Sequence, residues 1–198
     1  MIIVKLGGSL LQSGGLPGSL ACLQHLAQGR AVVIVPGGGV FAEQVRLAQQ
    51  QFQFDDGTAH DMALLAMQQM ALMLASLLGH ANLAHTVAEI NPQHSLSGLW
   101  VWSPSLAELA LAAIPTTWEI SSDSLAAWLA LRVNAKELVL VKSAPIDPRL
   151  SLQQLARQQI IDAAFCTMVA GAAVKIRIIH HQDLPLCLGW QEVMQPSS

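Results

Sequence analysis

Short apolar runs alternate with amphipathic stretches along the chain. The apolar runs at 1–6, 31–36, 98–102 and 137–143 predict buried strands, and the alternating segment 174–180 predicts another. Helical spacing predicts helices at 16–29, 40–52, 59–79, 104–113, 120–133, 151–159 and 162–173. Strands that alternate with helices favour an α/β fold, here a three-layer α/β/α sandwich with a mostly parallel central sheet.

Length and composition indicate one domain. The 198 residues are 53% hydrophobic and 12% charged, which provides enough apolar surface for a sizeable core. The chain contains no internal repeat and no linker-like segment. We therefore expect a single domain over residues 1–198.

Charge and cysteine content argue against several classes of protein. The net charge is −3 and no run of Lys or Arg occurs, so a nucleic-acid partner is not expected. Cys22, Cys166 and Cys187 are widely spaced, which favours reduced thiols in a cytoplasmic protein over a disulfide framework or a zinc site. The pair His180-His181 has no carboxylate or cysteine at metal-ligand spacing.

The apolar segment 62–79 raises the question of a membrane. Gln68 and Gln69 fall in its middle and Asp61 precedes it, which favours a buried core or interface helix over a membrane-spanning one. The first residues also lack the pattern of a signal peptide. We expect no membrane partner, and we expect this helix to join copies of the chain into a homodimer or a higher homo-oligomer.

Two glycine clusters follow the first two predicted strands. Gly7 and Gly8 end the first strand, and Gly37, Gly38 and Gly39 end the second. In parallel α/β sheets ligands bind at the carboxyl ends of the strands, and glycine lets backbone N–H groups approach an anion closely. One Gly-Gly pair alone is an ordinary tight turn, and neither GxxxxGK[ST] nor GxGxxG is present.

Lys5 shifts this interpretation toward a phosphate site. A lysine inside an apolar strand costs free energy unless it is paired or meets a ligand. Two glycine loops on consecutive strands, one of them carrying such a cation, therefore favour phosphate binding.

Three motifs in order give the chain a family resemblance. KLGGS (5–9), VPGGG (35–39) and SSDS (121–124) resemble the amino acid kinase family, which includes acetylglutamate, aspartate, uridylate and isopentenyl phosphate kinases. The resemblance runs from Met1 to about Ser143. Within the family, the stretches around 39–70 and 118–130 look most like the small aminomethylfuran phosphate kinase-like members of archaea and methylotrophs.

The resemblance implies an activity. It implies an ATP-dependent phosphotransferase that requires Mg²⁺ and acts on a small phosphate- or carboxylate-bearing acceptor. An aminomethylfuran phosphate is the first choice, with uridylate, isopentenyl phosphate or an amino acid as alternatives. A nucleotide- or anion-binding regulatory or storage protein of the same fold, without turnover, is the alternative from another class.

The resemblance also implies roles for individual residues. Lys5 would contact the transferring phosphoryl group, while Asp123 would orient the catalytic lysines and bear on the metal only indirectly, through Mg-ATP. The phosphates would be bound by Gly7, Gly8, Ser9, Ser121, Ser122, Lys142 and Ser143, with the Gly8 N–H facing the transition state. Gly37, Gly38 and Gly39 would approach the acceptor. For the motif SSDS, a simple helix N-cap remains the structural alternative.

The resemblance also implies a second cation near the nucleotide, for which the sequence offers three candidates. Lys142 ends a predicted strand, whereas Lys175 and Arg177 alternate along another strand as solvated charges do. We favour Lys142. From the length of the chain we expect the C-terminal nucleotide lobe of the family to be abbreviated.

Three further polar residues are candidates for acceptor contacts. His60 and Asp61 begin a helix that should pack beside the second glycine loop, although they fit the first turn of that helix equally well. The resemblance implies an acceptor contact for Glu119, four residues before Asp123. The tryptophans Trp100, Trp102 and Trp118 are interpreted as core or dimer-interface residues rather than base-stacking platforms.

Overall fold

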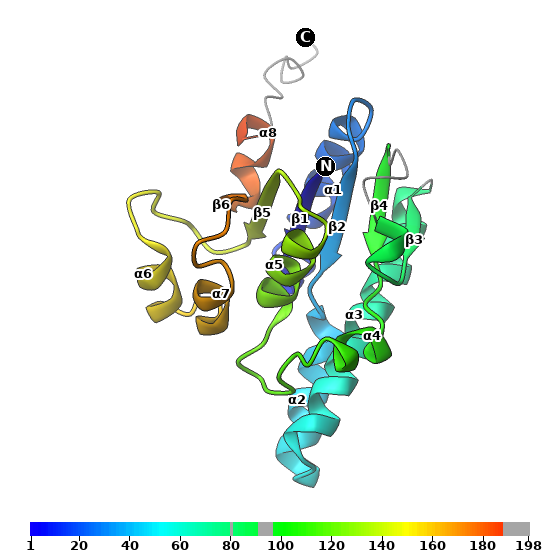
Figure 1. Cartoon of the computed structure of the whole chain (residues 1–198), viewed down its shortest axis with the longest axis vertical. Coiled ribbons are helices and arrows are strands. Elements are labelled where there is room, and N and C mark those ends of the chain that lie inside the picture. The colour runs from blue at the N-terminus through cyan, green and yellow to red at the C-terminus, as the bar shows by residue number, and fades with distance from the viewer. Residues whose placement is uncertain (80, 91–96, 188–198) are drawn as a thin grey trace.

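A six-stranded parallel sheet forms the centre of the structure (Figure 1). A computed structural model describes residues 1–79, 81–90 and 97–187. The strand order is β3-β4-β2-β1-β5-β6, and every strand pair in the described chain is parallel. The strands are β1 (Ile2–Leu6), β2 (Val32–Pro36), β3 (Asn82–Ala84), β4 (Leu99–Trp102), β5 (Glu137–Lys142) and β6 (Lys175–His180).

Helices cover both faces of this sheet, which confirms the predicted α/β/α sandwich. They are α1 (Leu16–Leu26), α2 (Gly39–Phe52), α3 (Asp56–Leu78), α4 (Leu106–Leu111), α5 (Ser122–Arg132), α6 (Leu152–Arg157), α7 (Ala163–Met168) and α8 (Leu184–Cys187), with the 3₁₀ turns η1 (Gly8–Leu10), η2 (Ala88–Ile90) and η4 (His181–Asp183). One core packs α4, α5, α6 and α7 on the sheet, and the other packs α1, α8 and the end of α3.

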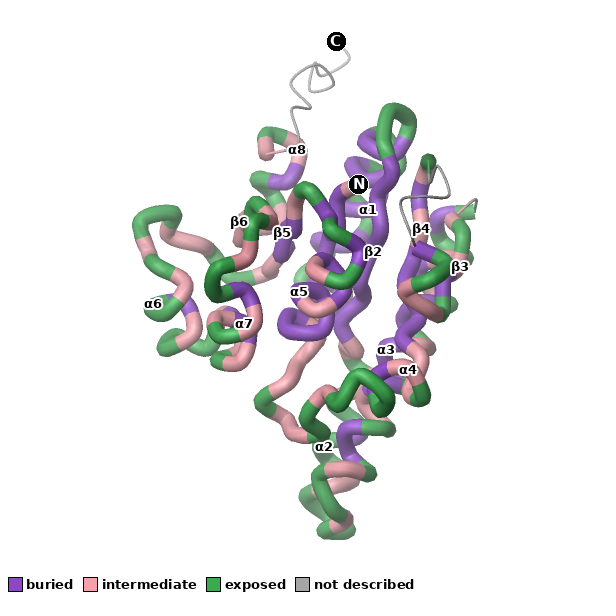
Figure 2. The backbone as a smooth tube through the Cα atoms, viewed as in Figure 1, coloured by how far each residue is buried: buried purple, intermediate pink, exposed green. Residues whose placement is uncertain are grey.

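The alternation of side chains along the central strands assigns each residue to a face. In β1, Ile3 belongs to the core beneath α5, while Ile2 and Val4 belong to the core beneath α1. Figure 2 shows the central strands buried along their length, and the outer ends of α2 and α6 exposed. Such strands, covered on both faces, read as continuous apolar runs in the sequence.

Helices α2 and α3 form a hairpin that extends beyond the sheet (Figure 1). In the described chain, α3 is the one helix long and apolar enough to cross a membrane. Its inner side nevertheless contributes Leu64 and Met67 to one core and Leu74 and Leu78 to the other. Gln68 donates a hydrogen bond to the Pro104 carbonyl at 2.7 Å, which anchors the polar middle of the helix.

Some predicted elements differ from the observed ones. Strand β3 was not predicted, because its three residues are too few to show a period. The predicted helices 151–159 and 162–173 are shortened to α6 and α7. Positive φ angles at Gln159 (58°) and Gly171 (73°) lie just beyond their ends and turn the chain away from helical geometry.

Candidate functional site

Two lysines meet at the carboxyl edge of the sheet because of strand alternation. Lys5 follows Ile3 on the face of β1 that lies beneath α5, and Lys142 follows Leu140 on the same face of the neighbouring β5. Lys5 is in register with Leu140, so Lys142 lies one side-chain repeat further toward the edge. The two ammonium groups are therefore diagonal neighbours below the start of α5.

A buried carboxylate joins these two cations. Asp123, in the first turn of α5, lies with Oδ1 2.8 Å from Lys5 Nζ and Oδ2 2.5 Å from Lys142 Nζ. Lys5 is 5% and Asp123 3% exposed. Burial opposes ionisation of Asp123, yet the ammonium groups of Lys5 and Lys142 keep the pKa of its carboxyl below the usual value. A charged aspartate thus holds two cations side by side.

The surroundings of Lys142 change the pKa of its ammonium group. Burial and the nearby Lys5 ammonium lower the pKa of Lys142 to about 8, although Asp123 acts in the opposite direction. Its ammonium form therefore gives up its proton much more readily than that of an ordinary lysine.

The other candidates for the second cation lie elsewhere. Lys175 begins β6 and is exposed. It lies at the amino ends of the strands, whereas Lys142 lies at their carboxyl ends. Arg177 Nε lies 2.6 Å from Glu137 Oε1, and Arg177 Nη1 donates to the Cys187 carbonyl at 2.5 Å. The guanidinium is therefore already paired with groups of the protein. The geometry therefore supports the preference for Lys142.

The two glycine loops touch each other backbone to backbone. A Cβ built on Gly8 would lie 2.5 Å from the N and Cα of Gly39, and one built on Gly37 would lie 2.7 Å from the Gly8 N. Gly39 also has a positive φ of 55°. The glycines are therefore required for the close contact between the two loop backbones. The sequence alone indicated only a contact with phosphate.

Backbone N–H groups gather where the loops meet. Gly7 donates to the Val141 carbonyl at 3.0 Å and Gly37 to the Leu6 carbonyl at 2.9 Å, which continues the ladder past the strand ends. The N-cap of α2 is Gly38, which has no side chain to close the first turn, so this turn presents its N–H groups and the positive end of the helix. Ser9 and Ser143 share a hydroxyl hydrogen bond of 2.7 Å across the loops.

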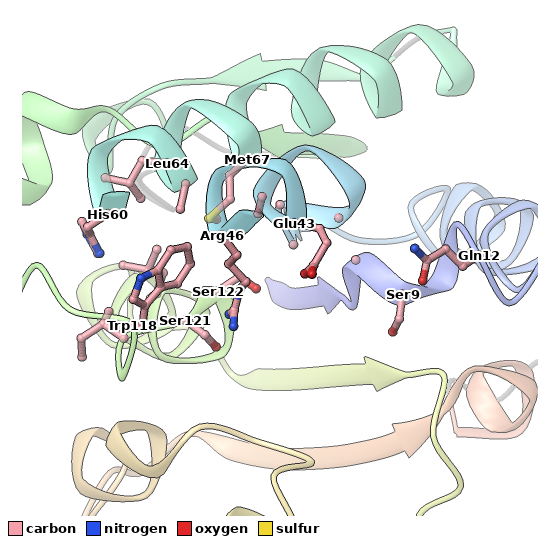
Figure 3. A pocket seen from close by; sticks show the side chains of 18 residues that line it. Ser9, Gln12, Glu43, Arg46, His60, Leu64, Met67, Trp118, Ser121 and Ser122 are labelled. Atoms are coloured by element: carbon pink, nitrogen blue, oxygen red, sulfur yellow. The ribbon is translucent and has the colours of Figure 1, made fainter. Parts of the chain in front are cut away.

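A cavity of about 530 Å³ opens beside the loops, within the size range of small-molecule sites (Figure 3). The loop residues Gly8, Ser9 and Gly37–Gly39 form one wall, and α2 and α3 form others. Ser121 and Ser122, at the start of α5, complete it. The cavity thus brings together the glycine loops and the serines that the sequence predicts.

An aromatic and cationic pair in the cavity wall was missed by sequence reasoning. The Arg46 guanidinium lies 4.4 Å from the centroid of the Trp118 ring, and Trp118 donates its indole N–H to Gln49 at 2.7 Å. Trp118 is only partly buried and lies in the cavity wall rather than in the core, because the chain before α5 folds back against α2. A role at a dimer interface stays a prediction. Helical spacing in the sequence could have indicated the place of Arg46. Gly39, Glu43 and Arg46 are four and three residues apart, so they share one side of α2 with the glycine loop.

The other two tryptophans do not line the cavity. Trp102 is fully buried and stacks on Trp128 with ring centroids 6.1 Å apart, which confirms its core assignment. Trp100 is partly buried and packs against the same core.

The predicted acceptor contacts separate in the structure. His60 is 6% exposed and lines the cavity, and its burial lowers the pKa of the imidazole, which is therefore neutral at pH 7. Asp61 and Glu119 are exposed and lie outside the cavity wall. Asp61 sits on the outer side of α3, and Glu119 lies in the irregular segment before α5, so neither is placed to contact a ligand in this cavity.

The serines of the motif SSDS have different roles. The Ser121 hydroxyl accepts from the Asp123 N–H at 3.1 Å and donates to Asp162 at 2.5 Å, so it caps α5 and has no further proton to donate to phosphate. Ser122 lines the cavity. Helix capping and site formation therefore occur in the same turn.

A metal would rely on the phosphates of a bound nucleotide. Both Asp123 oxygens already contact lysines, and the described residues contain no cluster of three His, Cys, Asp or Glu side chains suited to a metal ion. The donor set therefore fits Mg²⁺ carried in on phosphate oxygens rather than a cage of side chains.

Sequence comparisons match the chain to a family model and to a curated relative. The model of the "Amino acid kinase family" matches residues 1–145. A curated relative, [5-(aminomethyl)furan-3-yl]methyl phosphate kinase from Methanocaldococcus jannaschii, is 26% identical over 142 residues, which span 71% of this chain and 64% of the relative. The match therefore covers less than two thirds of that relative's length.

Solved structures share the fold. Uridylate kinase from Archaeoglobus fulgidus superposes with a TM-score of 0.73 at 17% identity, over 94% of each chain. UMP kinase from Bacillus anthracis gives 0.70 at 16% identity, over 95% of this chain and 91% of that one. Aspartate kinase from Synechocystis gives 0.67 at 16% identity, over 91% of this chain and 38% of that one.

Proposed function

The chain belongs to the amino acid kinase family, and we propose that it transfers the γ-phosphoryl group of ATP to a small phosphate- or carboxylate-bearing acceptor. The observation that carries this proposal is the bridge from Lys5 through Asp123 to Lys142 at the meeting point of the glycine loops. The curated relative, a kinase for a small phosphorylated compound, supports it.

Phosphoryl transfer requires positioned charge rather than covalent chemistry from the protein. Lys5 and Lys142 offer two ammonium groups for the equatorial oxygens of the phosphoryl group in transit. The Gly8 N–H and the open first turn of α2 offer neutral donors for the same oxygens. Mg²⁺, when bound with the nucleotide, supplies additional neutralisation of the phosphate charge.

Asp123 sets the distance between the two lysines. Without its carboxylate the ammonium groups would repel each other in a buried site. With it, both cations are held in place before the substrates bind, so little reorganisation is needed during the reaction. This preorganisation is the role we assign to Asp123.

The cavity favours an acceptor that combines a ring, an anion and a positive group. Trp118 offers an aromatic surface, Arg46 a cation and Glu43 a carboxylate, all in the cavity wall. An aminomethylfuran phosphate has a flat ring, a phosphate and an ammonium group, and we propose this class as the first choice. Uridylate, isopentenyl phosphate and amino acids are the alternatives to be screened.

A screen of acceptors tests the proposal. The protein is incubated with Mg-ATP and each candidate, and products are measured by mass spectrometry together with ADP. We expect one class of acceptor to gain a phosphoryl group, and we expect Lys5→Ala to lose this activity. Lys175→Ala is the matched control, because this lysine is exposed at the opposite edge of the sheet.

The two function classes predict different results in that screen. A binding protein without turnover would bind ATP or phosphate and form no product with any acceptor. If Lys5→Ala turns over ATP as well as the unmodified protein does, the kinase proposal fails.

We also propose that copies of the chain associate through α3. Leu65 and Leu72 lie two turns apart on one side of this helix and are 45% and 58% exposed. A homodimer would remove this apolar surface from water. Light scattering after size-exclusion chromatography tests this, with Leu72→Lys expected to shift the protein toward the monomer.

A further inference from the structure

Asp162 links the amino-terminal ends of α5 and α7, two helices that pack against each other (Figure 1). Its Oδ1 accepts hydrogen bonds from the Phe165 N–H at 2.6 Å and the Ser124 hydroxyl at 2.5 Å. Its Oδ2 accepts from the Ser121 N–H at 3.1 Å, the Ser121 hydroxyl at 2.5 Å and the Ser124 N–H at 3.1 Å. All of these bonds except the one from Phe165 come from the start of α5.

Capping of α7 alone does not explain this arrangement. An N-cap side chain satisfies a backbone N–H in the first turn of its own helix, and the bond from Phe165 does so here. The bonds to Oδ2 come only from Ser121 and Ser124. One oxygen of Asp162 is therefore committed entirely to α5.

The turn that Asp162 holds is the one that carries Asp123. Ser121 and Ser124 flank Asp123 in the sequence, and the carboxylate of Asp123 contacts both Lys5 and Lys142. Movement of this turn would move the carboxylate relative to both ammonium groups.

Asp162 also acts on Lys142 through its charge. Burial and the Lys5 ammonium of β1 lower the pKa of Lys142, whereas Asp123 of α5 and, more weakly, Asp162 at the start of α7 raise it. The same carboxylate therefore helps both to place the turn and to keep the second cation protonated.

We propose that Asp162 is a positioning residue for phosphoryl transfer, which fixes the first turn of α5 so that Asp123 holds Lys5 and Lys142 in place. This inference rests on the proposed function, because it assigns Asp162 a part in the same reaction. Asp162 acts by holding the turn that carries Asp123 and, more weakly, through its charge on Lys142. It is not among the residues that line the cavity.

Asp162→Ser separates the two roles of this residue. Serine still caps α7, but it has no charge and only one short hydroxyl, so it cannot hold Ser121 and Ser124 together. We expect kcat to fall about tenfold or more, because small displacements of catalytic groups are costly. We expect KM for the acceptor to change less than about twofold, since α2 and α3 form most of the acceptor cavity.

The pH profile and a direct titration provide readouts that a purely structural role would not change. We expect the alkaline limb of kcat/KM to move to lower pH in Asp162→Ser, because the variant loses a charge that favours the ammonium form of Lys142. NMR titration of the Lys142 ammonium, without an acceptor, should show the same direction. Asp55→Asn is the control, because Asp55 also caps a helix and accepts a hydrogen bond from the Thr58 N–H at 2.8 Å. It lies at the amino-terminal end of α3 and makes no hydrogen bond to α5.

Each outcome of this experiment is informative. If the unmodified protein transfers no phosphate but the pKa of Lys142 falls in Asp162→Ser, the proposed function fails and the link between Asp162 and Lys142 stands. If kcat and the Lys142 titration both match the unmodified protein, Asp162 only caps α7 and the inference is overturned. If Asp162→Ser does not fold, Asp162→Asn, which keeps the size of the side chain, is measured in the same way.

Discussion

The contact between the glycine loops can be tested by adding a single methyl group. Gly8→Ala places a Cβ 2.5 Å from the N and Cα of Gly39. Since carbon atoms prefer separations of about 3.5 Å or more, the loops must move apart by roughly 1 Å. Neither neighbour is a flexible side chain, so the backbone itself must give.

The size of the effect follows from this displacement. Overpacking of this kind costs about 1–3 kcal/mol of stability, which for a domain of this size lowers the unfolding temperature by about 3–9 °C. Misplacement by about 1 Å of the groups around a transferring phosphoryl lowers kcat about 100-fold. We therefore expect Gly8→Ala to lose far more activity than stability.

The measurement combines initial rates of ADP formation, with the acceptor found in the screen, and thermal unfolding. Gly18→Ala is the matched control, because its added Cβ meets nothing within 4 Å and it lies in the first turn of α1. It should keep full activity and gain up to about 1 kcal/mol of stability. Wild-type rates and unfolding temperature in Gly8→Ala would refute the reasoning.

Four further predictions concern the buried charges and the cavity. Because Lys142 must be protonated to act, kcat/KM should fall as pH rises through about 8. The fall of kcat should occur at a higher pH, because bound phosphate favours the ammonium form of Lys142. The unfolded chain binds this proton more tightly, so the free energy of unfolding should rise from pH 8 to about 10.5, and Lys142→Met should lack that rise in denaturant titrations. Asp123→Asn leaves two buried ammonium groups without a counter-charge and should destabilise the fold by about 3–5 kcal/mol in the same titrations, where a loss below about 1 kcal/mol would count against the charge bridge. Trp118→Ala should raise KM for the acceptor about tenfold through loss of an aromatic contact, and an equal rise in KM for ATP would contradict the assignment of this cavity to the acceptor.

Much of the site could be predicted from the sequence. Lys5, the glycine loops and Asp123 lie at strand or helix ends, where local patterns place them at the carboxyl edge of a parallel sheet. The choice between Lys142 and Lys175 also has a local basis, since Lys142 ends its strand at that edge and Lys175 begins its own strand at the other.

Other parts depend on contacts between distant segments. The sequence by itself determined the alternation of strands and helices, the two glycine loops and the cations at strand ends, because each of these is written in a period or a local turn. Only the tertiary structure decided that Gly8 and Gly39 touch, that Trp118 folds back against Arg46, and that Asp162 reaches α5. The physical reason is that such contacts depend on how whole elements pack and at what distance, and no local pattern of residues encodes that distance.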